Sequence, residues 1–192
     1  TIEDLDISES KQITELGISY LSKNLQKINI YGCLNIKEED YFKFKNIDIQ
    51  FNNSIYQTYP TLLYFLCEKG YLEIVQYLIE KGADINKSNN YGETPLYIAS
   101  QYGHLETMKF LIENGADINK SNNIGNTPLY SASFKGYLEI VKYLIEKGAD
   151  INQSNNDGKT PLYIASFYGH LEIVKYLIEK GADINKSNNY GE

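Results

Sequence analysis

The chain has 192 residues, of which 22% are charged and 42% hydrophobic, and its formal net charge is -7. All 18 basic residues are lysines, and because arginine is the preferred bidentate reader of phosphate and guanine, this composition argues against nucleic-acid binding. No run of about 18 apolar residues is present, so the sequence predicts no membrane-spanning helix.

In residues 1–57 the apolar residues recur with a spacing that differs from that of the rest of the chain. Two stretches share it, Leu25-x-x-Ile28-x-Ile30-x-x-Cys33-x-x-Ile36 and Phe44-x-x-Ile47-x-Ile49-x-x-Asn52-x-x-Ile55. Ile2-x-x-Leu5-x-Ile7 begins a looser copy, so that the three copies start at Ile2, Leu25 and Phe44. The alternation of apolar residues predicts short strands, and a short helix is expected between the first two copies, at Leu16, Ile18 and Leu21.

This spacing resembles the end of a cysteine-type leucine-rich-repeat array. The resemblance implies a short α/β segment in which Cys33 and Asn52 hydrogen bond the backbone where it bends. The alternative interpretation is a generic α/β cap. In either case we expect residues 1–57 to shield the apolar end of the repeats that follow.

A 33-residue repeat occupies residues 58–192. Its units are 58–90, 91–123, 124–156 and 157–189, the first of them in a weaker form. Tyr190-Gly191-Glu192 matches Tyr91-Gly92-Glu93, so a further unit begins at residue 190, and we expect the chain to be part of a longer protein. A repeat of this length is typical of a solenoid, in which stacked units bury a shared core.

Each repeat predicts two short helices and a polar loop. Thr94 followed by Pro95 marks the first helix, because threonine can cap free amides and proline fits the first helical position. We expect this helix to run about eight residues, to the glycines that permit a left-handed turn, Gly103, Gly136 and Gly169. The second helix carries an inward apolar stripe at Leu105, Met108, Leu111 and Ile112. An Asn-rich stretch after it suits a hairpin-like loop.

The motif Thr-Pro-Leu-Tyr-Ile-Ala-Ser-x-x-Gly-His-Leu-Glu, followed by Gly-Ala-Asp-Ile-Asn, resembles the ankyrin repeat. The resemblance implies a mainly α solenoid of stacked helix-turn-helix pairs with hairpin loops over residues 58–192, preceded by the α/β leucine-rich-like segment. Tyr97, Tyr130 and Tyr163 stand where the family usually has histidine. The sequence leaves open whether this larger side chain widens the spacing between repeats or replaces a loop hydrogen bond.

No pattern of catalytic or metal-binding residues is present in the sequence. His104 and His170 occupy the same repeat position, and we interpret them as residues that pack between repeats. The repeated aspartates lie too far apart in a solenoid to share one ion (Asp84, Asp117, Asp150 and Asp183). Neither a phosphate-binding glycine loop nor a serine nucleophile elbow occurs. We therefore expect no enzymatic activity, no cofactor and no metal.

Aromatic residues recur just before the glycine that ends the first helix. The resemblance places these positions, together with the loop tips, on a concave binding face. Exposed aromatic side chains that lie together often mark an interaction surface. The alternative is that these rings fold back onto the scaffold. The predicted partner-binding residues are Tyr91, Glu93, Gln101, Tyr102, Ile124, Asn126, Phe134, Lys135, Asp157, Lys159, Phe167 and Tyr168.

The leading hypothesis is a non-catalytic, monomeric scaffold that binds another protein and has no nucleic-acid or membrane partner. Cys33 and Cys67 form no disulfide framework and fit a reduced compartment, so we expect a cytoplasmic protein. Two alternatives stay open. One is a regulatory or substrate-recruiting segment of a larger enzyme, of the kinase or ubiquitin ligase type, and the other is a passive spacer.

Overall fold

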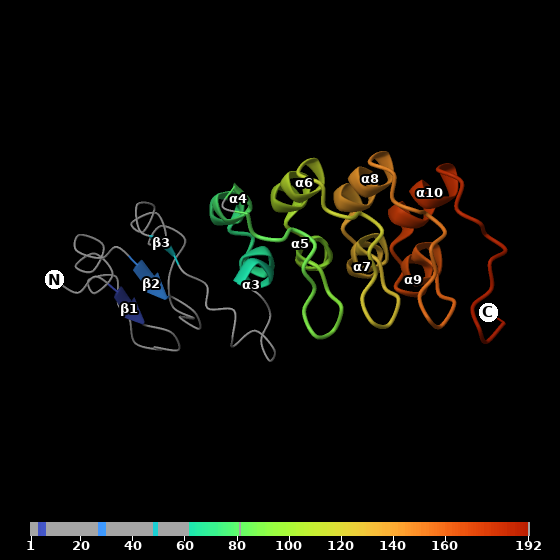
Figure 1. Ribbon diagram of the computed structural model, residues 1–192. Helices are drawn as coiled ribbons and strands as arrows, with labels where there is room; N and C mark the ends of the chain where they lie inside the picture. The colour runs from blue at the N-terminus through green and yellow to red at the C-terminus, as the bar shows by residue number, and fades with distance from the viewer. Residues whose placement is uncertain (1–3, 7–26, 30–47, 50–61, 81, 192) are drawn as a thin grey trace. The chain divides into compact units, whose positions relative to one another are not determined.

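The chain divides into two compact units, Thr1–Leu62 and Leu63–Glu192. The computed structural model describes residues 4–6, 27–29, 48–49, 62–80 and 82–191 (Figure 1). The predicted roles of Cys33 and Asn52 lie outside the described residues, as does the helix expected around Leu16, Ile18 and Leu21.

The first unit contains a three-stranded parallel sheet in the order β1-β2-β3. Its strands are β1 (Asp4–Asp6), β2 (Lys27–Asn29) and β3 (Asp48–Ile49). The register pairs Leu5 with Ile28, and Ile28 with Ile49. The copies in the sequence instead align Ile28 with Ile47, two positions earlier. A pattern in which every second residue is apolar does not distinguish registers that differ by two positions, so the sequence alone could not choose between them.

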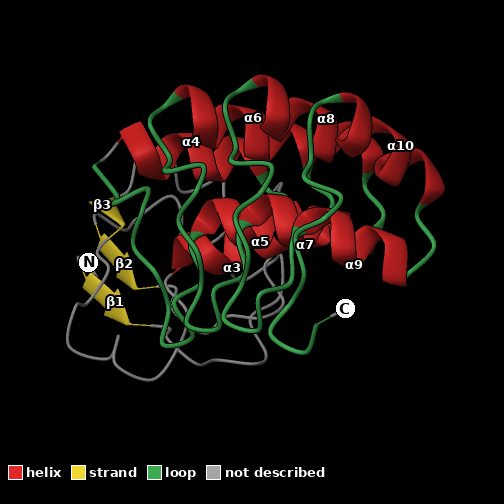
Figure 2. Ribbon diagram, turned by 90° about the vertical axis from the view of Figure 1, so that its right-hand side faces the viewer, coloured by secondary structure: helices red, strands yellow, loops and turns green. Residues whose placement is uncertain are grey.

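The second unit consists of helix pairs joined by loops. Its helices are α3 (Leu62–Lys69), α4 (Leu72–Glu80), α5 (Pro95–Tyr102), α6 (Leu105–Glu113), α7 (Pro128–Lys135), α8 (Leu138–Glu146), α9 (Pro161–Phe167) and α10 (Leu171–Glu179). Figure 2 shows the first helix of each pair in one row and the second helix in another. We call these the helix-one row and the helix-two row. None of the helices that the structure describes could cross a membrane, since none is long and apolar enough.

The ends of the helix-one row follow from local chemistry. The Thr94 hydroxyl accepts a hydrogen bond from the backbone N–H of Tyr97 at 3.1 Å, and Pro95 occupies the first turn of α5. Gly103 ends the helix at φ 84°, a left-handed conformation that favours glycine. In contrast, α9 ends one residue earlier than predicted, because the last turn tightens and the Gly169 N–H donates to the Ser166 carbonyl.

The core lies between the two rows of helices. Met108 and Leu111 of the predicted inward stripe are fully buried, whereas Leu105 and Ile112 are partly exposed at its edges. Successive repeats stack on one another, since α5 packs on α7 and α7 packs on α9. Each repeat therefore covers apolar surface of its neighbour, as a solenoid requires.

Asparagine side chains connect each loop to the next. The Asn123 N–H donates to the Tyr91 carbonyl at 2.9 Å, and its side-chain amide donates to the Asn90 carbonyl, also at 2.9 Å. Asn86 similarly accepts a hydrogen bond from the Asp117 N–H at 2.8 Å in the following repeat. These bonds align successive loops, and the loops run beside the helix-one row (Figure 2).

Candidate functional site

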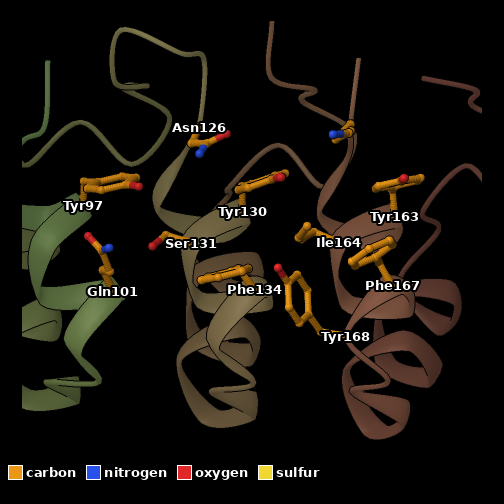
Figure 3. Close-up of a pocket in the computed structure, with 11 residues that line it drawn as sticks. Tyr97, Gln101, Asn126, Tyr130, Ser131, Phe134, Tyr163, Ile164, Phe167 and Tyr168 are labelled. Atoms are coloured by element: carbon orange, nitrogen blue, oxygen red, sulfur yellow. The ribbon is translucent and has the colours of Figure 1, made fainter. Parts of the chain in front are cut away.

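Three tyrosines form a row along the first helices. Tyr97, Tyr130 and Tyr163 each lie in the first turn, three residues after the capping threonine, in α5, α7 and α9. Figure 3 shows one ring from each helix, and the three rings have similar orientations. Tyr97 and Tyr130 are only 5% and 8% exposed, whereas Tyr163 in the last described helix pair is more open.

The hydroxyl of Tyr97 connects two repeats. Burial raises the pKa of Tyr97, and hydrogen bonds with the side chains of Ser131 and Asn126 lower it. Both partners belong to the following repeat. The tyrosine that replaces the usual histidine therefore reaches across to the neighbouring repeat with its hydroxyl.

Tyr130 has a different environment, because Ile164 and Lys159 take the places of Ser131 and Asn126 in the next repeat. Burial and then the carboxylate of Asp157 raise the pKa of Tyr130 to about 12. Its phenol is thus protonated at neutral pH and is available as a hydrogen-bond donor.

An aromatic cluster lies on α7 and α9. Tyr168 packs edge-to-face against Phe134, with ring centroids 4.7 Å apart, and against Phe167 at 5.2 Å. The ring of Phe167 in turn stacks on that of Tyr163 at 6.2 Å. Phe167 is 69% exposed and Tyr168 is 50% exposed, so the cluster presents apolar surface to solvent.

These features meet in one groove of about 460 Å³ (Figure 3). The residues that line it are Tyr97, Gln101, Asn126, Tyr130, Ser131, Phe134, Lys159, Tyr163, Ile164, Phe167 and Tyr168. We refer to the space between these side chains as the groove. Its volume lies within the range of roughly 300–1,000 Å³ that is typical of binding pockets.

The two ends of the groove differ in chemistry. Around Tyr97 the lining is polar and comprises Gln101, Asn126 and Ser131. Around Tyr163 it comprises the aromatic cluster, Ile164 and Lys159. A ligand that lies along the groove would therefore meet hydrogen-bonding groups at one end and rings beside a cation at the other.

Lys159 is the only charged residue among those that line the groove. Its ammonium group lies 3.4 Å from a carboxylate oxygen of Asp157, in a partly exposed ion pair. The same group is 5.9 Å from the ring centroids of both Tyr163 and Tyr190. Attraction to two ring faces holds the cation at the aromatic end of the groove.

Half of the predicted partner-binding residues line the groove. They are Gln101, Asn126, Phe134, Lys159, Phe167 and Tyr168. The other six lie outside it, namely Tyr91, Glu93, Tyr102, Ile124, Lys135 and Asp157. Of these, Tyr91 and Ile124 are strongly exposed at loop tips, whereas Glu93 is held by Asn89 at 2.8 Å and by Tyr64 at 3.1 Å. The role of all twelve in binding a partner stays a prediction.

Sequence reasoning missed five residues of the lining, namely Tyr97, Tyr130, Ser131, Tyr163 and Ile164. The tyrosines are part of the repeat motif, so the sequence pattern assigns them to the scaffold. One signal was present, because the difference between Ser131 and Ile164 is among the few between two nearly identical repeats.

The histidines and the described cysteine have structural environments. Nε2 of His104 lies 2.7 Å from the Glu68 carbonyl and Nε2 of His170 lies 2.9 Å from the Phe134 carbonyl, each in the preceding repeat. Burial raises the pKa of the Cys67 thiol, which keeps it protonated. Within the described part of the chain, no group of three or more His, Cys, Asp or Glu could hold a metal ion.

Comparison with known families agrees with this architecture. The model of ankyrin repeats (three copies) matches residues 36–122 and 117–188, which is well over half of the chain. The chain belongs to the ankyrin-repeat family. No curated protein matches it. Ankyrin repeats are generally protein-protein interaction modules, which agrees with a groove at whose aromatic end Phe167 and Tyr168 are exposed.

The ankyrin match begins within the segment for which the sequence predicts leucine-rich repeats. It starts at residue 36, whereas that prediction covers residues 1–57. The match therefore gives the leucine-rich prediction no support. For residues 62–80 and 82–191, the paired helices and connecting loops are those of a mainly α ankyrin solenoid.

Proposed function

We propose that this ankyrin-repeat chain is a non-catalytic scaffold that binds a protein partner in the groove and at the adjoining loop tips. The observation that carries the proposal is the solvent-exposed aromatic cluster, in which Phe167 and Tyr168 are 69% and 50% exposed. Large aromatic side chains that stay in water next to a groove lose unfavourable hydration when a partner covers them.

In this proposal the two ends of the groove have separate roles. Phe134, Phe167 and Tyr168 supply most of the apolar contact, because buried aromatic anchors dominate the energetics of protein interfaces. Lys159 and Asn126 favour partners with complementary polar groups. The loop tips around Tyr91 form the rim. We further propose that the scaffold acts as a cytoplasmic monomer.

We also propose that the unit before the ankyrin repeats is a short leucine-rich-like segment, with a boundary near residues 57–58. In support, its strands are parallel, and their register places Leu5, Ile28 and Ile49 side by side. The spacing of these three residues along the chain suits leucine-rich repeats, which have a period of about 20–29 residues and one strand per repeat.

The test is affinity capture from a lysate of the source cell. The wild-type chain is compared with the variant Phe134→Ser/Phe167→Ser/Tyr168→Ser. Because Phe134 is partly buried, the double variant Phe167→Ser/Tyr168→Ser is tested alongside it. We expect both variants to lose a protein that the wild type retains. The double variant should also keep a similar melting temperature, since its two residues are largely exposed.

The control is Tyr143→Ser, which removes an aromatic ring from α8 in the helix-two row. It should retain the same protein as the wild type. Identical capture by the wild type and by a folded double variant would contradict the proposed site. A large fall in the melting temperature of the double variant would show that these rings belong to the core instead.

A further inference from the structure

The groove presents an equivalent side chain once in every repeat. Tyr97, Tyr130 and Tyr163 belong to α5, α7 and α9, which pack in succession. Packed helices lie about 8–10 Å apart. A polyproline II helix has three residues per turn and rises about 3.1 Å per residue, so one turn is about 9 Å long. A peptide in this conformation would therefore pass an equivalent tyrosine at every third residue. Tyr97 and Tyr130 are only 5% and 8% exposed, so they offer it little more than their edges, whereas Tyr163 is more open.

The hydrogen-bonding groups of the groove also suit this conformation. The phenols of Tyr130 and Tyr168 can donate hydrogen bonds, as can the amide of Gln101. A polyproline II backbone makes no internal hydrogen bonds, so its carbonyls are free to accept them. Proline has no N–H of its own to satisfy, and its ring packs against aromatic faces, as in other aromatic-lined grooves that bind proline-rich peptides. In this groove the exposed rings are those of Phe167 and Tyr168, at the aromatic end.

Two other peptide conformations fit less well. An α-helix uses its own carbonyls internally and is about 10–12 Å wide, which is broad for a groove of about 460 Å³ that extends over three repeats. An added β-strand needs a free backbone edge to pair with. Most of the lining comes from α5, α7 and α9, whose backbone groups already pair within the helices. The two loop residues of the lining, Asn126 and Lys159, have their backbone groups paired with Asn122 and Asn155.

Charge distinguishes the two ends of the groove. The lining contains Lys159 and no carboxylate, although the chain as a whole is acidic. The Lys159 ammonium lies beside the Tyr163 ring, at the aromatic end. A carboxylate on the ligand would compete there with Asp157, whose oxygen is 3.4 Å away.

From these observations we propose that the groove binds a proline-rich segment of the partner in the polyproline II conformation, with an acidic residue beside Lys159. This inference rests on the proposed function, because the segment is the part of the partner that enters the groove.

The first test varies the spacing of the prolines. The immobilised 192-residue chain is exposed to three nonapeptide pools with prolines fixed at every second, third or fourth position and the other positions randomised. We expect the pool with prolines at every third position to be retained best, and Asp or Glu to be enriched at one end of the bound peptides. Equal retention of the three pools, or enrichment of Lys or Arg, would overturn the inference.

The second test uses the best peptide of that pool in a fluorescence anisotropy titration. Lys159→Gln should weaken binding about tenfold, as expected when a hydrogen bond to a charged group is lost. Asp157→Asn should strengthen binding, because it removes the competing carboxylate. The control Lys175→Gln, on the exposed face of α10, should leave the affinity unchanged.

The outcomes separate this inference from the proposed function. If the lysate experiment yields a partner that depends on the groove but no pool is enriched, the proposed function stands and the proline-rich ligand is wrong. If Lys159→Gln and Lys175→Gln change the affinity equally, the proposed acidic contact with Lys159 is wrong.

Discussion

At the scale of single residues, the tyrosine in the first turn of each first helix serves both the scaffold and the groove. Its backbone N–H is bound by the capping threonine, as at Thr127 and Tyr130, where the distance is 3.1 Å. The rings of Tyr97 and Tyr130 are largely covered, and the hydroxyl of Tyr97 faces the next repeat. A histidine is shorter and would not extend a phenol along the groove, so the substitution changes the lining of the groove while the capping bond is kept.

Tyr130 leads to a prediction about alkaline stability. Burial, followed by the Asp157 carboxylate, raises its pKa in the folded chain to about 12, from an ordinary value of about 10. Since the folded-state pKa is the higher one, the contribution of this phenol to stability is fully present below pH 10. It is lost as the pH rises from about 10 to about 12.

We therefore expect the free energy of unfolding, measured in urea at several pH values, to fall less steeply between pH 10 and 12 in Tyr130→Phe than in the wild type. Lysines titrate in the same range in both proteins, so their contribution cancels in the comparison. Parallel curves for the two proteins would show that Tyr130 ionises normally.

At the scale of elements, the close contact between successive loops requires glycine at the loop tips, where a side chain would not fit. Gly125 at a loop tip has φ 82°, and a Cβ there would lie 2.6 Å from the Asn156 side-chain oxygen and 2.7 Å from its backbone nitrogen. Gly148 after α8 has a similar φ of 94°, but nothing lies within 4 Å of the corresponding position. The two glycines therefore share a backbone conformation but differ in the space available for a side chain.

This pair separates backbone strain from steric conflict. Gly148→Ala should lower the free energy of unfolding by about 1–2 kcal/mol, the strain of a left-handed alanine. Gly125→Ala should cost roughly 2–5 kcal/mol, because it adds the displacement of the next loop to the same strain. Chemical denaturation of both variants tests the difference. Equal losses would show that the loops move apart freely.

At the scale of the whole molecule, the position of a repeat in the stack decides how much of it is buried. The helices α8 and α10 have the identical sequence LEIVKYLIE. In α10, Leu171 is 59% exposed and Ile178 is 49% exposed, whereas the equivalent Leu138 and Ile145 of α8 are partly buried. The difference arises because α10 covers α8, while no described helix covers the outer side of α10.

We predict that these two helices differ in local stability. In a solenoid the interfaces between neighbours supply much of the stability, so a repeat with one neighbour opens more readily than a repeat with two. Amide hydrogen exchange of the 192-residue chain should therefore be faster in α10 than in α8. Because the sequences are identical, intrinsic exchange rates do not account for a difference. Equal protection would contradict the role assigned to the interface.

Much of the fold was predictable because its determinants are local. Thr94, Pro95 and Gly103 define a helix through a cap, a fixed φ angle and a left-handed turn, all close together along the chain. The groove was only partly predictable. Phe167 and Tyr168 were recognised as binding candidates, whereas Tyr130 and Ile164 were not, because their place in the lining depends on which residues the next repeat brings beside them.

The sequence by itself determined the repeat, the starts of the first helices, the polar loops and the ankyrin family, since each depends on residues that are close along the chain. Tertiary structure alone decided which side chains share the groove and how much of each is exposed. The physical reason is visible in α8 and α10, where one sequence has two levels of burial. Burial depends on the neighbouring repeat, and an isolated stretch of sequence does not contain that neighbour.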